Sequence, residues 1–208
     1  RNETPQDLAE SIDEMAKRIA KAQIIMFPGG FSAGDEPEGS GKFIATLFRS
    51  PALKEALNDL LYKRDGLALG VCNGFQALIK LGLLPYGRIQ PLRPDSPTLT
   101  YNTIGRHLSR MVNTKVVSVM SRWFSFMKAG EVHTIAISHG EGRFVATPQQ
   151  IRELAAKGQI ATQYVDLSGN ASNDSEYNPN QSIMAVEGIT SPDGRVLGKM
   201  AHTERFSG

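Results

Sequence analysis

The hydrophobic positions of the first fifty residues predict one helix, one strand and the start of a second helix. Thr4 has the features of a helix N-cap, because Pro5 follows it and an acidic residue, Asp7, occupies the third helical position. Apolar residues that share one face of this first helix follow at helical spacing: Leu8, Ile12, Met15 and Ile19. A short apolar strand is expected over 23–27, and Ser50 begins the second helix.

Strands and helices continue to alternate along the rest of the chain. Further strands are expected over 67–69, 115–119, 132–137 and 159–165, further helices over 75–80 and 148–157, and a C-terminal hairpin over 183–189 and 195–200. This alternation predicts an α/β fold with a flavodoxin-like, mostly parallel sheet, helices on both faces and a C-terminal β-hairpin. Ligands of such sheets bind at the carboxyl ends of the strands.

Composition narrows the class of protein. The 208 residues are 40% hydrophobic and 21% charged, with a net charge of +2 and a single cysteine. The sequence has no basic stripe that would indicate nucleic-acid binding. It also has no apolar run that approaches the ~20 residues of a membrane span. One cysteine excludes an internal disulfide and fits a reducing compartment, so we expect a cytoplasmic protein with neither nucleic-acid nor membrane partners.

No cofactor or metal motif is recognisable. The sequence has no dinucleotide fingerprint and no P-loop. Its four histidines lack the spacing of metal ligands: His107, His133, His139 and His202. We therefore expect no cofactor and no metal in this chain.

The cysteine lies in a G-x-C-x-G pattern between an apolar run and a helical run. Gly70 and Gly74 flank Cys72 at the spacing of a nucleophile elbow, a strained turn from strand to helix. A helix N-terminus also stabilises a thiolate. A small buried cysteine is the alternative, but the flanking glycines favour a nucleophile.

A second glycine-rich loop follows the strand over 23–27. Residues 28–35 contain Gly29, Gly30 and Gly34, whose backbone N–H groups could point at a developing oxyanion. A plain turn is the alternative. In a parallel sheet this loop and Cys72 lie at the same edge, because both follow the ends of strands.

A thiolate nucleophile needs a base and a group that orients it. His202 and Glu204 project to the same side of an extended segment, so that the carboxylate can hold the imidazole. A solvated chain end is the alternative. His139 is a rival base, but Gly140 and Gly142 beside it suggest close approach of a ligand, and we assign it to substrate binding.

Seven segments together resemble a class I, triad-type glutamine amidotransferase, and in particular the glutaminase domain of phosphoribosylformylglycinamidine synthase. They are FPGGFS (27–32), GDEP (34–37), GVCNGFQ (70–76), SHGEGRF (138–144), QYVD (163–166), NPN (178–180) and DGRV (193–196). The resemblance runs from about residue 22 to the end.

This resemblance implies a mechanism. Cys72 attacks the side-chain amide of glutamine, and the backbone N–H groups of Gly30 and Asn73 hold the oxyanion. His202, oriented by Glu204, transfers the protons, and water then releases glutamate from the thioester. The residues implied to contact glutamine are Gln76, His139, Gly140 and Glu141.

The resemblance also implies a partner. Ammonia passes to a synthetase domain, in the same chain or in a separate subunit, where ATP and magnesium activate formylglycinamide ribonucleotide for conversion to the amidine in purine biosynthesis. Two expectations about the chain accompany it. Residues 1–208 form a single amidotransferase domain that lacks the family's first strand and helix before Leu8, and Ala201 and Thr203 replace the prolines that usually flank the histidine. A non-catalytic docking module and another cysteine hydrolase on the same fold are the alternative functions.

Overall fold

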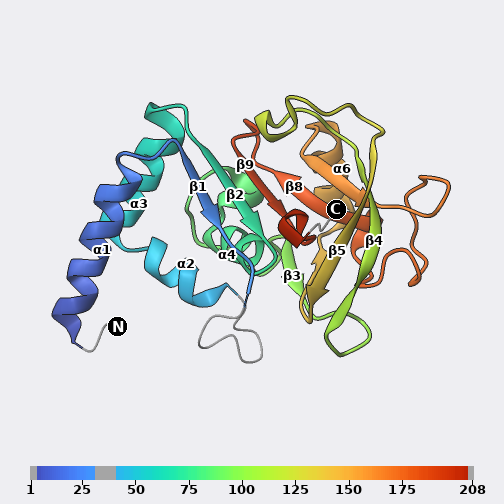
Figure 1. The fold of residues 1–208 in the computed structure, drawn as a ribbon, viewed down its shortest axis with the longest axis horizontal. Coiled ribbons are helices and arrows are strands. Elements are labelled where there is room, and N and C mark those ends of the chain that lie inside the picture. Colours follow the sequence, from blue (N-terminus) through green and yellow to red (C-terminus); the bar gives the residue numbers. More distant parts are fainter. Residues whose placement is uncertain (1–3, 31–40, 206–208) are drawn as a thin grey trace.

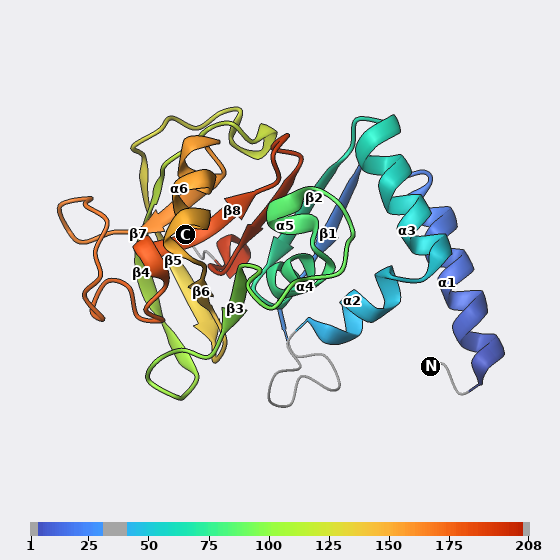
Figure 2. The same cartoon turned by 180° about the vertical axis from the view of Figure 1, so that it is seen from behind.

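The computed structural model describes residues 4–30 and 41–205 (Figures 1 and 2). Its helices are α1 (Pro5–Ile19), α2 (Lys42–Phe48), α3 (Pro51–Asn58), α4 (Asn73–Leu81), α5 (Leu83–Tyr86) and α6 (Pro148–Ala156). Its strands are β1 (Ile24–Phe27), β2 (Leu67–Val71), β3 (Thr98–Thr100), β4 (Leu108–Val116), β5 (Val132–His139), β6 (Arg143–Val145), β7 (Ile160–Tyr164), β8 (Val186–Thr190) and β9 (Val196–Lys199). A π-helical turn follows α3 at Asp59–Lys63, and short 3-10 turns lie at Arg122–Phe124, Ile183–Ala185 and Thr203–Arg205.

Seven of these strands form one sheet in the order β1-β2-β9-β8-β7-β4-β5. Pairing is parallel from β1 through β2 to β9 and antiparallel across the rest. The α/β fold and the C-terminal β8–β9 hairpin are confirmed, and parallel pairing is confined to the part of the sheet that contains the Cys72 turn. There Phe27 is opposite Gly70, and Val71 is opposite Lys199, so three strand ends lie side by side.

The cap predicted for the first helix is present. Thr4 accepts a hydrogen bond from the Asp7 backbone N–H at 3.1 Å, and the Asp7 carboxylate accepts from the Thr4 N–H at 2.9 Å. The sequence did not predict α2, which begins at the left-handed Gly41 without a side-chain cap. The capping signals on which helix prediction rests are thus missing at this position.

The strand expected over 115–119 is wrong in its extent. The strand β4 covers 108–116, and the Val117 N–H instead donates to the Ala161 carbonyl as the chain turns away. β-branched residues favour a strand, but the partners β5 and β7 decide where pairing stops.

The main hydrophobic core lies between one face of the sheet and helices α1, α3 and α4. Four leucines of α3 and of the π-helical turn after it are fully buried in this core: Leu53, Leu57, Leu60 and Leu61. Phe27 of β1 is also buried there, whereas Ile24 and Met26 on the other face of this edge strand are about half exposed.

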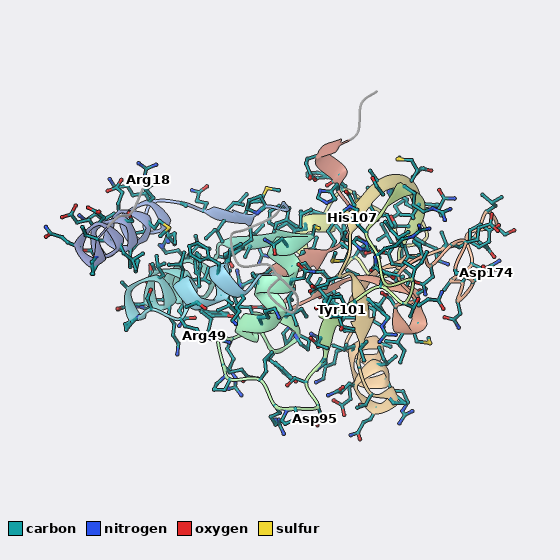
Figure 3. The ribbon with its side chains drawn as sticks, turned by 90° about the horizontal axis from the view of Figure 1, so that it is seen from below. Arg18, Arg49, Asp95, Tyr101, His107 and Asp174 are labelled. Atoms are coloured by element: carbon teal, nitrogen blue, oxygen red, sulfur yellow. The ribbon has the colours of Figure 1, made fainter. Side chains whose placement is uncertain are left out.

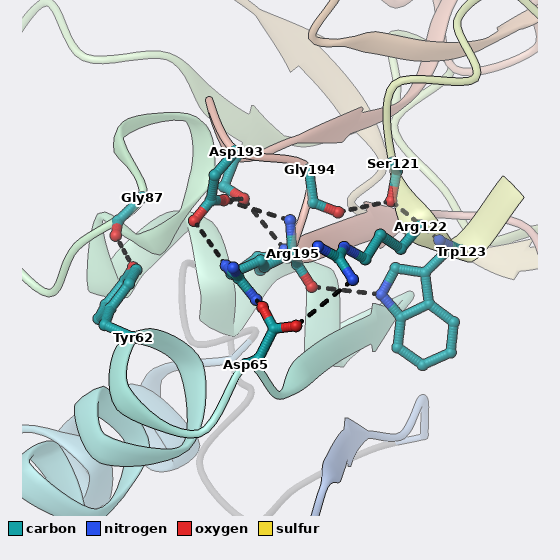
Figure 4. A network of polar contacts seen from close by, with 11 residues as sticks. Tyr62, Asp65, Gly87, Ser121, Arg122, Trp123, Asp193, Gly194 and Arg195 are labelled. Carbon is teal, nitrogen blue, oxygen red and sulfur yellow. Dashed lines mark hydrogen bonds and ion pairs between the residues drawn. The ribbon is translucent and has the colours of Figure 1, made fainter. Parts of the chain in front are cut away.

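The opposite face of β2 and β9 is covered by the segment around Trp123 rather than by a long helix. Gly198 of β9 faces Phe75 and Leu84, while its neighbour Leu197 packs against Phe124 on the other side. The Trp123 indole N–H donates to the Ala68 carbonyl at 3.1 Å and to the Arg195 carbonyl at 3.3 Å (Figure 4). Trp123 and Phe124 of this segment thus serve packing, whereas Phe126 is fully exposed.

Arg18 on α1 and Asp174 in the loop after β7 mark opposite ends of the molecule, and His107 lies between them (Figure 3). No helix in the described ranges is long and apolar enough to cross a membrane.

Candidate functional site

Cys72 occupies the tight turn between β2 and α4. Its backbone angles, φ 52° and ψ −109°, are strained for a residue with a side chain, and it is the N-cap residue of α4. A Cβ at Gly74 would collide with the Phe27 carbonyl, and one at Gly70 would lie 2.5 Å from Leu78 Cδ1. Both glycines are therefore needed for the close approach of β1, β2 and α4, as the G-x-C-x-G pattern predicts.

The C-terminal hairpin brings His202 to this turn. Because β9 pairs with β2, the Cys72 N–H donates to the Lys199 carbonyl at 2.8 Å. The chain then leaves β9, and the His202 N–H donates to the Ala136 carbonyl of β5, also at 2.8 Å. His202 is therefore fixed by its backbone between the two parts of the sheet.

Gly29, the second residue after β1, lies against the Cys72 and His202 side chains. A Cβ at Gly29 would lie 2.6 Å from His202 Cε1 and 3.2 Å from Cys72 Cβ. The structure thus brings together the glycine loop, the cysteine turn and the late histidine at one edge of the sheet. Gly30 adopts φ 112°, which favours glycine, whereas residues 31–35 of the predicted loop and the GDEP segment over 34–37 lie outside the described residues.

His202 and Glu204 form a close pair. Nδ1 of His202 lies 2.5 Å from Glu204 Oε1, with the histidine 2% exposed and the glutamate side chain 46% exposed. The other ring nitrogen, Nε2, is buried and has no hydrogen-bond partner among the described residues. This arrangement matches the role of an imidazole that is held at one nitrogen and exchanges protons at the other.

The end of β5 and the residues after it contact the Cys72 turn and α4. The Cys72 thiol donates to the Ser138 carbonyl at 3.6 Å, and the Gln76 amide of α4 donates to the Glu141 carbonyl. His107, seen in Figure 3, holds Ser138 from outside, with Nε2 3.0 Å from Ser138 Oγ. The segment over 138–142 is thus anchored to both the turn and α4.

His139 is a buried, neutral imidazole, and its assignment to substrate binding stays a prediction. It is 3% exposed, and neither ring nitrogen has a hydrogen-bond partner among the described residues. Burial, and after it the nearby His107 and His202, lower its pKa to about 4. Gly142 accommodates this ring, because a Cβ there would lie 2.5 Å from His139 Nδ1, whereas space at Gly140 is open. The group that approaches Gly142 closely is therefore the His139 side chain.

Sequence reasoning missed the buried polar residues that hold this loop. The Asn102 side chain donates to the His139 carbonyl at 2.8 Å and accepts from the Gly142 N–H at 3.1 Å. Asn180 donates to the Gly142 carbonyl at 2.8 Å and to the Tyr164 hydroxyl at 3.0 Å. The NPN motif over 178–180 has the composition of a solvated turn, and nothing in its letters shows that Asn180 is fully buried.

No group of three or more metal-binding side chains occurs in the described part of the chain.

Comparison with known proteins identifies the family. The sequence model of the CobB/CobQ-like glutamine amidotransferase domain matches residues 4–208. The chain belongs to this family of glutamine amidotransferases. The amidotransferase is 34% identical over 191 residues to phosphoribosylformylglycinamidine synthase subunit PurQ of Aquifex aeolicus, covering 92% of this chain and 76% of that protein. It is 38% identical over 200 residues to the PurQ subunit of Methanococcus maripaludis, covering 91% and 68%.

A solved structure agrees with these relatives. The amidotransferase matches the structure of PurLQS from Thermotoga maritima with a TM-score of 0.65 and 26% identity, over 88% of this chain and 69% of that one. Together the matches confirm the resemblance to the glutaminase part of phosphoribosylformylglycinamidine synthase.

Proposed function

We propose that this amidotransferase is the glutaminase part of a phosphoribosylformylglycinamidine synthase and releases ammonia from glutamine at Cys72. The supporting observation is the position of Gly29, because a Cβ there would lie 2.6 Å from His202 Cε1 and 3.2 Å from Cys72 Cβ. A nucleophile and a base with its orienting carboxylate thus face one point of the sheet edge.

The reaction begins when the Cys72 thiol turns from the Ser138 carbonyl toward His202. Nε2 takes the thiol proton, and the thiolate sulfur forms a bond to the amide carbon of glutamine. The negative charge that develops on the amide oxygen is held by the backbone N–H groups of Gly30 and Asn73. A donor of this kind accelerates acyl transfer by about 10²–10³-fold.

His202 then returns the proton to the leaving nitrogen, the carbon–nitrogen bond breaks, and ammonia departs. Water attacks the Cys72 thioester while Nε2 of His202 takes its proton, and glutamate leaves as the thiol is restored. Glu204 keeps Nδ1 paired throughout, which fixes the ring orientation and stabilises the imidazolium.

Glutamine binds between α4 and the loop after β5. Gln76 and the backbone over 139–141 provide the polar groups of this subsite. Asn102 and Asn180 hold the loop from its buried side. The neutral His139 contributes shape and a low-dielectric wall rather than charge.

Ammonia passes from this site to a synthetase partner, either a further domain of the same chain or a separate subunit. The PurQ relatives are named as subunits of the synthase, and the Thermotoga structure is of PurLQS. ATP and magnesium belong to the reaction of the synthetase, which converts formylglycinamide ribonucleotide to the amidine.

The test replaces Cys72 by alanine in the complete enzyme and compares two nitrogen sources. Glutamine-dependent formation of the amidine should fall to background, because no other described side chain takes the place of the nucleophile. Formation of the amidine from free ammonia should persist, because the synthetase is untouched. Glutamine-dependent activity that survives in the Cys72→Ala variant would contradict the proposal.

A further inference from the structure

Glu187 is a buried acidic residue that the mechanism above does not use. It lies on β8 and is only 1% exposed, in a sheet whose neighbouring side chains Val186 and Ile189 are apolar. A buried carboxylate costs several kcal/mol of desolvation unless strong hydrogen bonds offset it. The partners of this carboxylate therefore indicate what it does.

Both carboxylate oxygens of Glu187 accept hydrogen bonds. Oε1 accepts from the Ala201 backbone N–H at 2.7 Å, and Oε2 accepts from the Thr162 hydroxyl of β7. The bond to Ala201 joins a carboxylate to a peptide N–H, which is about twice as strong as a bond between neutral groups. Ala201 directly precedes His202.

The backbone changes its hydrogen-bond partners between Met200 and His202. The Met200 N–H still donates to the Glu187 carbonyl of β8, at 3.3 Å, whereas the His202 N–H donates to the Ala136 carbonyl of β5. The Ala201 N–H lies between them and is fully buried, so it needs an acceptor of its own. The Glu187 side chain supplies this acceptor where the chain crosses from β9 to β5.

We propose that Glu187 is a positioning residue for His202: its carboxylate fixes the Ala201 peptide and thereby the place of the imidazole beside Cys72. This inference rests on the proposed function of the site. A displacement of reacting groups by about 1 Å costs about 10²-fold in rate, so a loosened Ala201 peptide should lower turnover rather than binding.

The surroundings of the carboxylate link it to the rest of the site. Tyr164 of β7 is fully buried, and its pKa is raised well above its usual value by burial, by the charge of Glu187 and by that of Cys72. Its hydroxyl accepts from Asn180, which also holds the substrate loop. Glu187 therefore belongs to a polar layer beneath the nucleophile.

Three variants of the complete enzyme test the proposal. Glu187→Met keeps the volume and removes both acceptors. Glu187→Gln keeps an oxygen for the Ala201 N–H and offers an amide that donates to Thr162 Oγ1. Thr162→Val is the matched control, because it removes the other hydrogen bond and leaves the one to Ala201.

The expected result is a split between kcat and KM for glutamine hydrolysis. Glu187→Met should lower kcat at least ~10-fold with KM for glutamine within ~3-fold, while Glu187→Gln and Thr162→Val keep kcat within ~3-fold of the parent. Ammonia-dependent activity should be unchanged in all three variants, and circular dichroism reports whether each is folded. If Glu187→Met does not fold, Glu187→Gln decides, because the proposal requires it to be active.

Two results would overturn the inference. One is full kcat in a folded Glu187→Met variant. The other is a loss of kcat in Glu187→Gln as large as that in Glu187→Met, because Glu187→Gln retains the acceptor for the Ala201 N–H. Cys72→Ala, measured in parallel, separates this outcome from failure of the proposed function. If Cys72→Ala is inactive with glutamine while Glu187→Met is fully active, only the role of Glu187 is refuted. If Cys72→Ala hydrolyses glutamine, the proposed function itself fails.

Discussion

At the scale of single residues, the site depends on close contacts that leave no room for a Cβ. Gly29 lies against both the imidazole of His202 and the side chain of Cys72, and Gly142 lies against the imidazole of His139. Sequence patterns identify such glycines but not the atoms they face. Gly142 looked like a site of ligand approach, and its neighbour is instead a buried side chain of the same protein.

Gly29→Ala should inactivate the glutaminase without unfolding the protein. Its Cβ would lie 2.6 Å from His202 Cε1, so the imidazole must move away from Cys72. We expect kcat for glutamine to fall about 10²-fold, because a shift of about 1 Å between reacting groups has this effect. Steady-state kinetics with glutamine measures the change, and unaltered kcat would show that the imidazole does not act from this position.

The neutral state of His139 predicts a dependence of stability on pH. The folded-state pKa is about 4, below the ordinary value of 6.5, so between these pH values the unfolded chain binds a proton that the folded chain does not. Stability is therefore complete above pH 6.5 and falls as the pH drops toward 4, by on the order of 3 kcal/mol.

Thermal unfolding of the His139→Phe variant between pH 7 and pH 4 tests this linkage. The variant should lose most of the decrease in unfolding temperature that the parent shows over this range. His133→Phe replaces a partly exposed histidine and should keep the slope of the parent. Parallel slopes for the parent and His139→Phe would contradict the assignment.

At the scale of elements, the β2–turn–α4 unit follows directly from its sequence. The apolar run, the glycines around Cys72 and the helical run all appear where the pattern places them. In contrast, α2 has no side-chain cap, and the end of β4 is set by its neighbours. Local chemistry thus predicts elements that carry their own signals, but not boundaries that tertiary pairing decides.

Gly74→Ala should disrupt the packing of α4 on β1. The new Cβ would overlap the Phe27 carbonyl, and a backbone atom in a sheet cannot move aside as a flexible side chain can. We expect the free energy of unfolding to fall by on the order of 3 kcal/mol, at the upper end of overpacking costs. Denaturant unfolding measures it. Gly140→Ala is the stability control, because a Cβ there meets only His107 backbone atoms at 4.0 Å.

At the scale of the whole molecule, the C-terminal hairpin assembles the site. Strand β9 pairs with β8 on one side and with β2 on the other, which places His202 beside a cysteine far earlier in the chain. The sequence indicated both the hairpin and the pair His202–Glu204. It did not show the pairing of β9 with β2, because parallel register depends on contacts between distant segments. Nor did it reveal Glu187, since a lone acidic residue in a strand usually faces solvent.

The end of β2 and β9 remote from Cys72 is held by a polar network (Figure 4). Asp65 pairs with Arg195 and with Arg122, and these guanidinium groups hold the pKa of the Asp65 carboxyl below its usual range. The Trp123 indole adds hydrogen bonds to the Ala68 carbonyl of β2 and to the Arg195 carbonyl directly before β9. This network fixes the two strands relative to each other at the end that is remote from the site.

Trp123→Phe should weaken this junction and leave catalysis intact. It removes the indole N–H from the Ala68 and Arg195 carbonyls, and each such hydrogen bond contributes about 1 kcal/mol. We expect the free energy of unfolding to fall by about 1–2 kcal/mol, with KM for glutamine unchanged. Phe126→Ala, at a fully exposed aromatic of the same segment, should have no effect on stability. A Trp123→Phe variant as stable as its parent would show that the indole bonds contribute nothing.

The most direct test of the account is to trap the thioester. The complete enzyme is mixed with isotopically labelled glutamine, quenched in acid during turnover, digested and analysed by mass spectrometry. We predict a glutamyl adduct on the peptide that contains Cys72, absent from the Cys72→Ala variant. Release of labelled glutamate with no adduct on Cys72, or with the adduct on another residue, would contradict the account.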